Sequence, residues 1–267
     1  MKRWIWRTIG GVAALTLLGF VIIQQKNKRC QGIVIQLDEQ AEYPFFTEDD
    51  IKNLVNNNNT DQIEDILFEK INLQTIETRV LKNRLIKKCQ AYRDLFGHLV
   101  VIIEQQKPIG RLVGYSGENQ LLTASQGGYL TETGELVPLS SRFAARVILV
   151  SGDFFKNPKK NLHSENGQRL VELLKIIQKD PLWKAQLTEL TVLADGEITI
   201  QPLVGQYQIE FGLPDNIDKK LKKLSIFYNT ILPLKNWERY KRVSVKFKNQ
   251  IVCELKFQPV LVKNLDI

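Results

Sequence analysis

The sequence predicts an α+β protein that is held to a membrane by one N-terminal transmembrane helix. Three observations lead to this fold class. Residues 9–23 carry no charge, residues 31–106 follow a β-α-α-β-β pattern, and residues 108–258 hold a longer series of strands with two amphipathic helices. The alternation of apolar and polar residues in that last part predicts a mostly antiparallel sheet with two helices.

Residues 4–23 form a nearly apolar segment of about 20 residues, interrupted by Arg7 and Thr8, which is about the length of a helix that crosses a bilayer, and we expect the transmembrane anchor at 9–26. Trp4 and Trp6 precede it, and indoles are typical of the membrane interface. A cleaved secretory signal is the competing interpretation, but no Ala-x-Ala site follows the apolar core. Basic residues flank both sides, and the amino group adds positive charge at the short side. We therefore expect a cytoplasmic tail at 1–8 and translocation of the remaining chain.

The first module after the anchor is predicted at 31–106. Thr47 can cap a helix, acidic residues fill its first turn, and Asn72 can cap a second helix. Two β-rich runs near the end are joined by a loop that contains Gly97, which predicts a hairpin. The expected elements are a strand at 32–38, a helix at 47–55, a short helix at 61–68, a helix at 72–81 and hairpin strands at 85–92 and 98–105.

Lys107, Pro108 and Gly110 end this module. Proline removes a strand donor and glycine loosens the backbone. We therefore expect a domain hinge at these three residues.

The second module is predicted at 108–258, followed by a C-terminal tail at 259–267. Asp195-Gly196 between two alternating runs is a strong hairpin signal, and Pro233 is expected to end the last helix. The expected strands are 127–137 with a central turn, 146–152, 189–193, 197–202, 207–211, 242–247 and 250–257, and the expected helices are 166–179 and 217–232.

The last strand is a candidate binding site because a terminal strand often lies at a sheet edge, where unpaired main-chain groups can accept a partner strand. Its alternation places Ile251, Cys253 and Leu255 on one face and Val252, Glu254 and Lys256 on the other. The alternative is that the strand only completes the core sheet, and the two roles are compatible. A proline at Val252 is expected to block partner binding while the domain stays folded.

Composition and residue patterns do not point to an enzyme. The formal charge is +8, but the basic clusters are small and lie among acidic or apolar residues, which does not favour nucleic-acid binding. The three cysteines are scattered, and neither histidine has a neighbouring metal ligand. We therefore expect no catalytic residues, no cofactor, no metal and no small-molecule substrate.

The layout of a short tail, one anchor, a β-α-α-β-β module and an α+β domain resembles the cell-division protein family FtsQ/DivIB, in its Bacteroidota-like form. The β-α-α-β-β module resembles the POTRA domain of that family. Lys107 departs from the arginine that is common before the family's hinge proline. The segments that carry the resemblance are 97–112, 128–140, 146–152, 180–186, 204–205 and 220–228.

The resemblance implies a non-enzymatic divisome scaffold in the inner membrane, single-pass and type II, with its bulk in the periplasm at the septum. It implies binding of FtsB-like and FtsL-like proteins and an influence on the septal synthase complex. Strand addition would then use the last two strands, and the residues implicated are Val243, Val245, Phe247, Gln250, Ile251, Val252, Cys253, Glu254 and Leu255. A POTRA-containing anchored component of protein secretion or envelope assembly stays open as the alternative, as does an anchored cell-wall enzyme.

Overall fold

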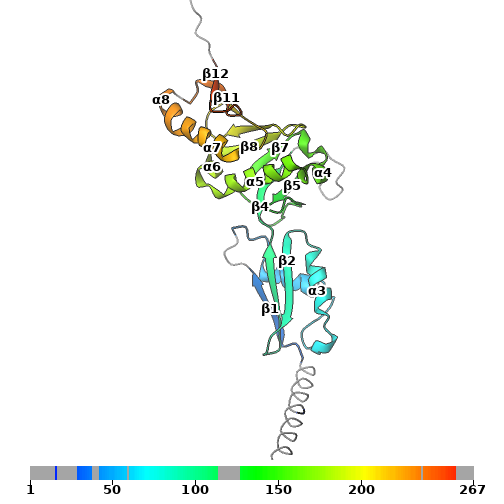
Figure 1. Ribbon diagram of the computed structural model, residues 1–267. Coiled ribbons are helices and arrows are strands. Elements are labelled where there is room, and N and C mark those ends of the chain that lie inside the picture. Colours follow the sequence, from blue (N-terminus) through cyan, green and yellow to red (C-terminus); the bar gives the residue numbers. More distant parts are fainter. Residues whose placement is uncertain are drawn as a thin grey trace, which may run out of the picture. The chain divides into compact units, whose positions relative to one another are not determined.

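The computed structural model describes residues 16, 29–37, 42–58, 60–113, 127–235 and 237–256. The chain forms two compact units, Met1–Gln106 and Lys107–Ile267 (Figure 1). The predicted anchor at 9–26 lies outside the described residues except for Thr16, and so do Trp4 and Trp6. Within the ranges given above, no helix combines the length and the apolar character needed to cross a membrane.

The first unit contains a three-stranded sheet that two α-helices contact. Strand β3 lies in the centre, parallel to β1 and antiparallel to β2, so the β-α-α-β-β prediction is confirmed. The elements are β1 (Gly32–Leu37), α2 (Glu48–Val55), a 3₁₀ turn η1 (Phe68–Lys70), α3 (Leu73–Leu81), β2 (Ile86–Arg93) and β3 (His98–Gln105).

Both helices begin where their capping residues predict. The Thr47 hydroxyl accepts a hydrogen bond from the Asp50 backbone N–H, and the Thr47 N–H donates to the Asp50 carboxylate at 2.8 Å, which completes a capping box. Asn72 Oδ1 accepts from the Thr75 N–H at 3.0 Å at the start of α3. Apolar residues at helical spacing then pack against the strands, and the buried set includes Ile51, Val55, Ile76, Val80, Leu99, Val101 and Ile103.

The predicted short helix at 61–68 is wrong. Asp65 adopts a positive φ of 69°, which a right-handed helix does not allow. The backbone groups of this segment pair instead with the entry to β1: the Cys30 N–H donates to the Ile66 carbonyl at 2.9 Å, and the Asp65 N–H donates to the Cys30 carbonyl at 2.8 Å. Tertiary hydrogen bonds have therefore replaced the local helical ones.

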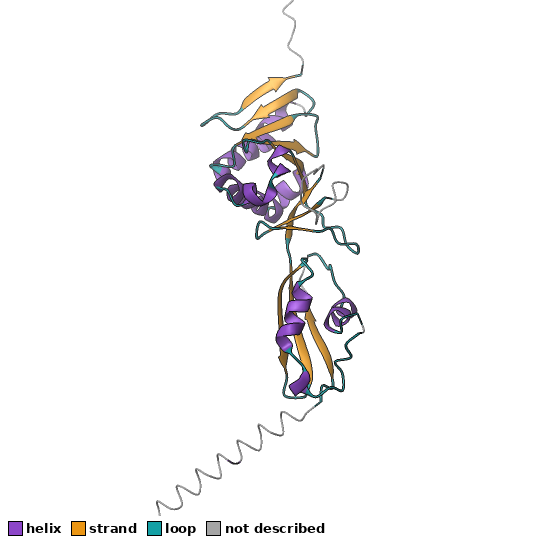
Figure 2. Cartoon of the chain, turned by 90° about the vertical axis from the view of Figure 1, so that its right-hand side faces the viewer, coloured by secondary structure: helices purple, strands orange, loops and turns teal. Residues whose placement is uncertain are grey.

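The second unit is built on one nine-stranded sheet in the order β12-β11-β10-β9-β8-β7-β4-β5-β6. Figure 2 shows these strands in orange beside a group of helices in purple. The strands are β4 (Pro108–Leu112), β5 (Gly128–Thr131), β6 (Leu136–Val137), β7 (Ile148–Ser151), β8 (Leu187–Val192), β9 (Ile198–Pro202), β10 (Gln208–Gly212), β11 (Tyr240–Ser244) and β12 (Val252–Leu255). The helices are η2 (Asp153–Lys156), α4 (Pro158–Leu162), α5 (Glu165–Lys179), α6 (Pro181–Gln186), α7 (Ile217–Ile226), a π-helical segment η3 (Phe227–Ile231) and α8 (Leu232–Lys235).

This sheet is mixed: five of its eight neighbouring pairs are antiparallel, in line with the predicted mostly antiparallel sheet, and more helices accompany it than the two predicted. Three neighbouring pairs are parallel, namely β4 with β7, β7 with β8 and β10 with β11. Parallel neighbours need a crossover connection, and helices supply it between β7 and β8 and between β10 and β11. Short helices such as α4 and α6, each of which begins with a proline, add to the two long ones that the periodicity predicts.

The last helical region does not end at Pro233. Helix α7 passes into the π-helical segment η3, and Pro233 lies inside the following α8. A proline has no N–H to donate to a helical carbonyl. The π-helical turn before Pro233 shifts the hydrogen-bond pattern by one residue, so the pairing of carbonyls with N–H groups differs from that of a regular α-helix. Phe227, Tyr228 and Leu232 are buried on this stretch, so packing of the aromatic side chains against the sheet accompanies its continuation.

Candidate functional site

Strand β12 lies at the end of the sheet. It pairs antiparallel with β11 on one side, and within the described residues no strand pairs with its other side. Arg242 is aligned with Glu254, Val243 with Cys253 and Ser244 with Val252. The main-chain groups on the free side of β12 are therefore available to a further strand.

The direction of the main-chain groups follows from two hydrogen bonds. The Val245 N–H donates to the Glu210 carbonyl at 3.0 Å. The main-chain N–H and C=O groups of Val243, two residues earlier in the strand, therefore also point toward β10. The main-chain groups of Arg242 and Ser244 must then point toward β12. The main-chain groups of their aligned partners, Glu254 and Val252, point back toward β11.

A second hydrogen bond supports the same alternation, because the Lys256 N–H donates to the Arg239 carbonyl at 3.0 Å. Residues 252, 254 and 256 thus direct their main chain into the hairpin. The main-chain N–H and C=O groups of Ile251, Cys253 and Leu255 point to the free edge.

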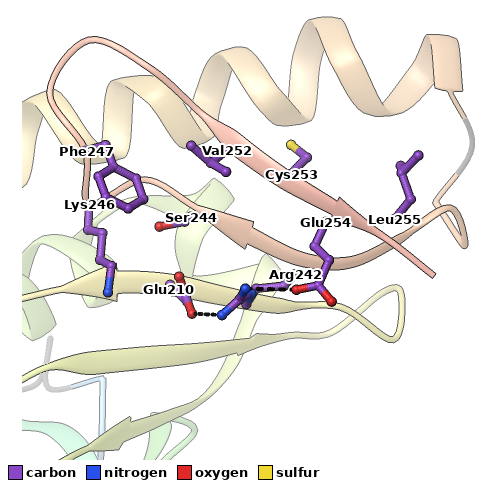
Figure 3. A pocket seen from close by; sticks show the side chains of 9 residues that line it. All are labelled: Glu210, Arg242, Ser244, Lys246, Phe247, Val252, Cys253, Glu254 and Leu255. Atoms are coloured by element: carbon purple, nitrogen blue, oxygen red, sulfur yellow. Dashed lines mark hydrogen bonds and ion pairs between the residues drawn. The ribbon is translucent and has the colours of Figure 1, made fainter. Parts of the chain in front are cut away.

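A β-bulge brings two cations to one carboxylate on the exposed face of this hairpin. The alignment shifts between Tyr240 and Arg242, so that Lys241 and Arg242 both lie opposite Glu254. Glu254 contacts Lys241 Nζ at 3.1 Å and Arg242 Nη2 at 2.9 Å, and Arg242 Nη1 also contacts Glu210 at 2.7 Å. Figure 3 shows Arg242 between the two carboxylates.

These ion pairs perturb the titration of their members. The hydrogen bond from Lys241, together with the charges of Lys241 and Arg242, holds the pKa of Glu254 below its usual range. The hydrogen bond and charge of Glu210 raise the pKa of Arg242. The pairs cross β10, β11 and β12, so they hold the outermost strand in register through side chains as well as through the ladder.

The two faces of β12 differ, as the alternation predicts. Ile251, Cys253 and Leu255 pack against the core, and burial raises the pKa of the Cys253 thiol. Val252 is 45% exposed on the other face. An open groove of about 620 Å³ follows the hairpin, and its lining residues are Glu210, Arg242, Ser244, Lys246, Phe247, Val252, Cys253, Glu254 and Leu255.

The structure brings only part of the predicted partner-binding set to the edge. Val243 and Val245 are fully buried, and their main chain faces β10 rather than the free side. Phe247 and Gln250 lie in the connection between β11 and β12, where Phe247 is 43% exposed. The predicted residues that lie on or next to the edge strand are Ile251, Val252, Cys253, Glu254 and Leu255.

Pro108 and Gly110, predicted as parts of a hinge, lie within strand β4. Pro108 is the first residue of the strand, and the pairing with β5 shifts between Pro108 and Gly110. A first position or a bulge is where a sheet accepts proline. Lys107 alone of the three precedes the strand, and motion about these residues stays a prediction.

Lys223 is a residue of this site that sequence reasoning missed. Its Nζ donates to the main-chain carbonyls of Val245 and of Phe247, the latter at 2.6 Å. Burial, and to a smaller extent the positive charge of Lys220, lowers the pKa of the Lys223 ammonium. The partners are backbone carbonyls in a distant connection, so no spacing pattern in the sequence could have revealed the contact.

The side chains around β12 form a charged groove that suits binding of another chain. In the part of the chain that the structure covers, no group of three or more His, Cys, Asp or Glu side chains is arranged to hold a metal ion. What the geometry at β12 can do is extend the sheet, with main-chain groups for attachment and a charged groove for selectivity.

Two sequence families match the chain. The family described as "FtsQ/DivIB, C-terminal related" matches residues 119–254, and the family described as "POTRA-like domain" matches residues 28–104. The first match covers half of the chain and includes the whole of β12 except its last residue. No curated protein sequence matches the chain.

Proposed function

Since this chain belongs to the FtsQ/DivIB, C-terminal related family and carries a POTRA-like domain, we propose that it is a non-enzymatic scaffold of the cell-division machinery. It binds an FtsB-like protein and an FtsL-like protein in the periplasm and helps to recruit and regulate the septal cell-wall synthase. The segment at 9–26 anchors it in the inner membrane as a single-pass type II protein, and it acts at the division septum.

The free side of β12 is the observation that carries this proposal. A partner segment in extended conformation pairs with the outward main-chain groups of Ile251, Cys253 and Leu255 and adds a tenth strand to the sheet. Main-chain pairing gives affinity with little demand on side-chain identity. The ion pairs around Arg242 keep the edge strand ordered before the partner arrives, which lowers the ordering cost of binding.

The test uses the full chain in detergent and the periplasmic part of the FtsB-like protein from the same organism. Cys253→Pro removes an outward N–H, and Cys253→Ala retains it, so the pair isolates the main-chain contribution. We expect Cys253→Pro to weaken binding by at least about tenfold, since a lost backbone bond and strain at the edge add to about 1.4 kcal/mol or more. Cys253→Ala should stay within about threefold of the wild type.

Two further observations complete the test. Circular dichroism must show that the proline variant is folded, and a chain lacking residues 250–267 must lose binding. Equal affinity of the folded proline and alanine variants would overturn strand addition at β12. No binding to either an FtsB-like or an FtsL-like partner would overturn the scaffold proposal, and the envelope-assembly alternative would then be tested.

A further inference from the structure

Two large apolar side chains protrude from the first unit at the connection between β2 and β3. Leu95 is 80% exposed and Phe96 is 75% exposed. Most other large hydrophobic residues at the surface of the described chain are about half-buried. Among the described residues, only Leu234, at 77%, is exposed to a comparable degree. Adjacent exposed Leu and Phe at a loop tip are unusual for a surface that meets only water.

The turn that presents this pair is well defined. The Asp94 carboxylate accepts from the His98 N–H at 2.7 Å and contacts His98 Nδ1 at 2.9 Å, and the Asp94 N–H donates to the His98 carbonyl at 3.0 Å. Gly97 supplies the positive φ of 95° that closes the loop. The turn therefore requires Asp94 and Gly97, but nothing in its geometry requires apolar side chains at 95 and 96.

The tip lies beside the point where the chain enters the unit. The Gln31 N–H donates to the Gly97 carbonyl at 2.8 Å, and a Cβ placed on Gly97 would lie 3.6 Å from the Arg29 carbonyl oxygen. Arg29 follows the end of the predicted anchor, residue 26, by three positions. Three residues of extended chain span at most about 10 Å, so the tip stays within reach of the membrane surface from which the anchor emerges.

Two arginines lie close to the ends of this turn. Arg93 directly precedes the turn, and its guanidinium lies 4.6 Å from the centre of the Phe68 ring. Arg29 donates to the Asp65 carbonyl at 2.8 Å. The nearby Asp94 is already paired with His98. An apolar tip with cationic residues beside it fits the interface of a bilayer that contains anionic phospholipid.

We propose that Leu95 and Phe96 insert into the headgroup and acyl boundary of the bilayer that holds the anchor. The inference rests on the anchor of the proposed function. Insertion adds a second attachment point near residue 29 and limits how the first unit can tilt about its tether. It needs no division partner, so it is independent of strand addition at β12.

Fluorescence quenching by brominated phospholipid tests the proposal on the full chain, reconstituted in vesicles of phosphatidylethanolamine and phosphatidylglycerol. Trp4→Phe and Trp6→Phe form the background, because both indoles are expected at the membrane. Phe96→Trp reports on the tip. Leu81→Trp is the matched control: Leu81 is 42% exposed and precedes the other end of β2, about 25 Å from the turn.

Flotation of the vesicles reports on the anchor separately. We expect the protein to float, and bromolipid to reduce the added fluorescence at 96 at least about twofold more than at 81. Leu95→Ser with Phe96→Ser should then increase the protease sensitivity of the chain near residue 29. Flotation without selective quenching at 96 would overturn insertion and leave the anchor intact, in which case the tip would suit a protein partner. Equal quenching at 96 and 81, or no flotation, would also overturn the proposal.

Discussion

The Lys223 ammonium, on helix α7, donates a hydrogen bond to the main-chain carbonyl of Val245, in the connection between the last two strands. The same ammonium bonds the Phe247 carbonyl. Helix and hairpin are thus joined by one cation that satisfies two carbonyls outside the ladder. The edge strand β12 is the arm of that hairpin farthest from the rest of the sheet, so its order depends on how firmly the connection is held.

Lys223→Met should loosen the hairpin without unfolding the unit. Two charge-assisted hydrogen bonds at a partly exposed site contribute about 1–2 kcal/mol to local order. We expect amide hydrogen exchange in residues 245–252 to become about tenfold faster, because the lost free energy raises the population of open states. Lys222→Met, at the exposed neighbouring position, is the control. Unchanged exchange in Lys223→Met would refute the positioning role.

Gly110→Ala should destabilise the second unit by about 1–3 kcal/mol. An added Cβ would lie 2.8 Å from Val150 Cγ2 and 3.7 Å from Leu174 Cδ1, so β4 could no longer approach β7 and α5 as closely. Urea unfolding followed by tryptophan fluorescence would measure the loss, since Trp183 and Trp237 lie in this unit.

Gly32→Ala is the matched control for this substitution. Its added methyl group would meet no atom closer than 3.9 Å, and it lies in the first unit. It should leave the fluorescence transition of the second unit unchanged. If Gly110→Ala behaves in the same way, then the tight packing of β4 is not needed for stability.

Asp215→Asn should remove stability at neutral pH but not in strong acid. The hydrogen bond from Lys220 lowers the pKa of Asp215 below its ordinary value. A carboxylate with a lowered folded-state pKa stabilises the fold above its ordinary pKa, and the contribution is lost as the pH falls through the folded-state pKa.

The expected difference between the wild type and Asp215→Asn is about 1–2 kcal/mol at pH 7. It is modest because the Asp215 side chain is 42% exposed and partly screened, although its partner Lys220 is buried. Denaturation curves at pH 7 and at about pH 2 would measure it. A difference that persists in acid would mean that the ion pair is not its source.

Local signals predicted the elements that local forces form. Thr47 and Asn72 each mark a helix start, because the side-chain oxygen accepts a hydrogen bond from a backbone N–H only three residues later. Both partners of such a contact can be recognised within a short stretch of sequence. Asp195-Gly196 marks the hairpin of β8 and β9 for the same reason, with Gly196 at a φ of 92°. The alternation in β12 also predicted that Ile251, Cys253 and Leu255 share one face, and the structure shows that this face packs on the core.

The features that depend on pairing between distant parts of the chain could not be predicted from the sequence. The segment at 61–68 has helical periodicity, but its backbone bonds the entry to β1 across more than thirty residues. Parallel pairs such as β4 with β7 depend on crossovers, which strand patterns do not encode. For the candidate site, Val252 was a natural choice for a proline test, yet its main chain faces β11. Only the ladder alignment shows that the N–H of Cys253, like those of Ile251 and Leu255, points outward.

The passage from the first sheet to the second has a mechanical consequence. Strand β3 ends at Gln105 and β4 begins at Pro108, so two residues join the central strand of one sheet to an interior strand of the other. Each of these strands must lose a ladder on both sides before it can extend. Five strands separate β4 from β12 within the second sheet. Tension along the chain between the two sheets would therefore act on two strands that are each held by ladders on both sides.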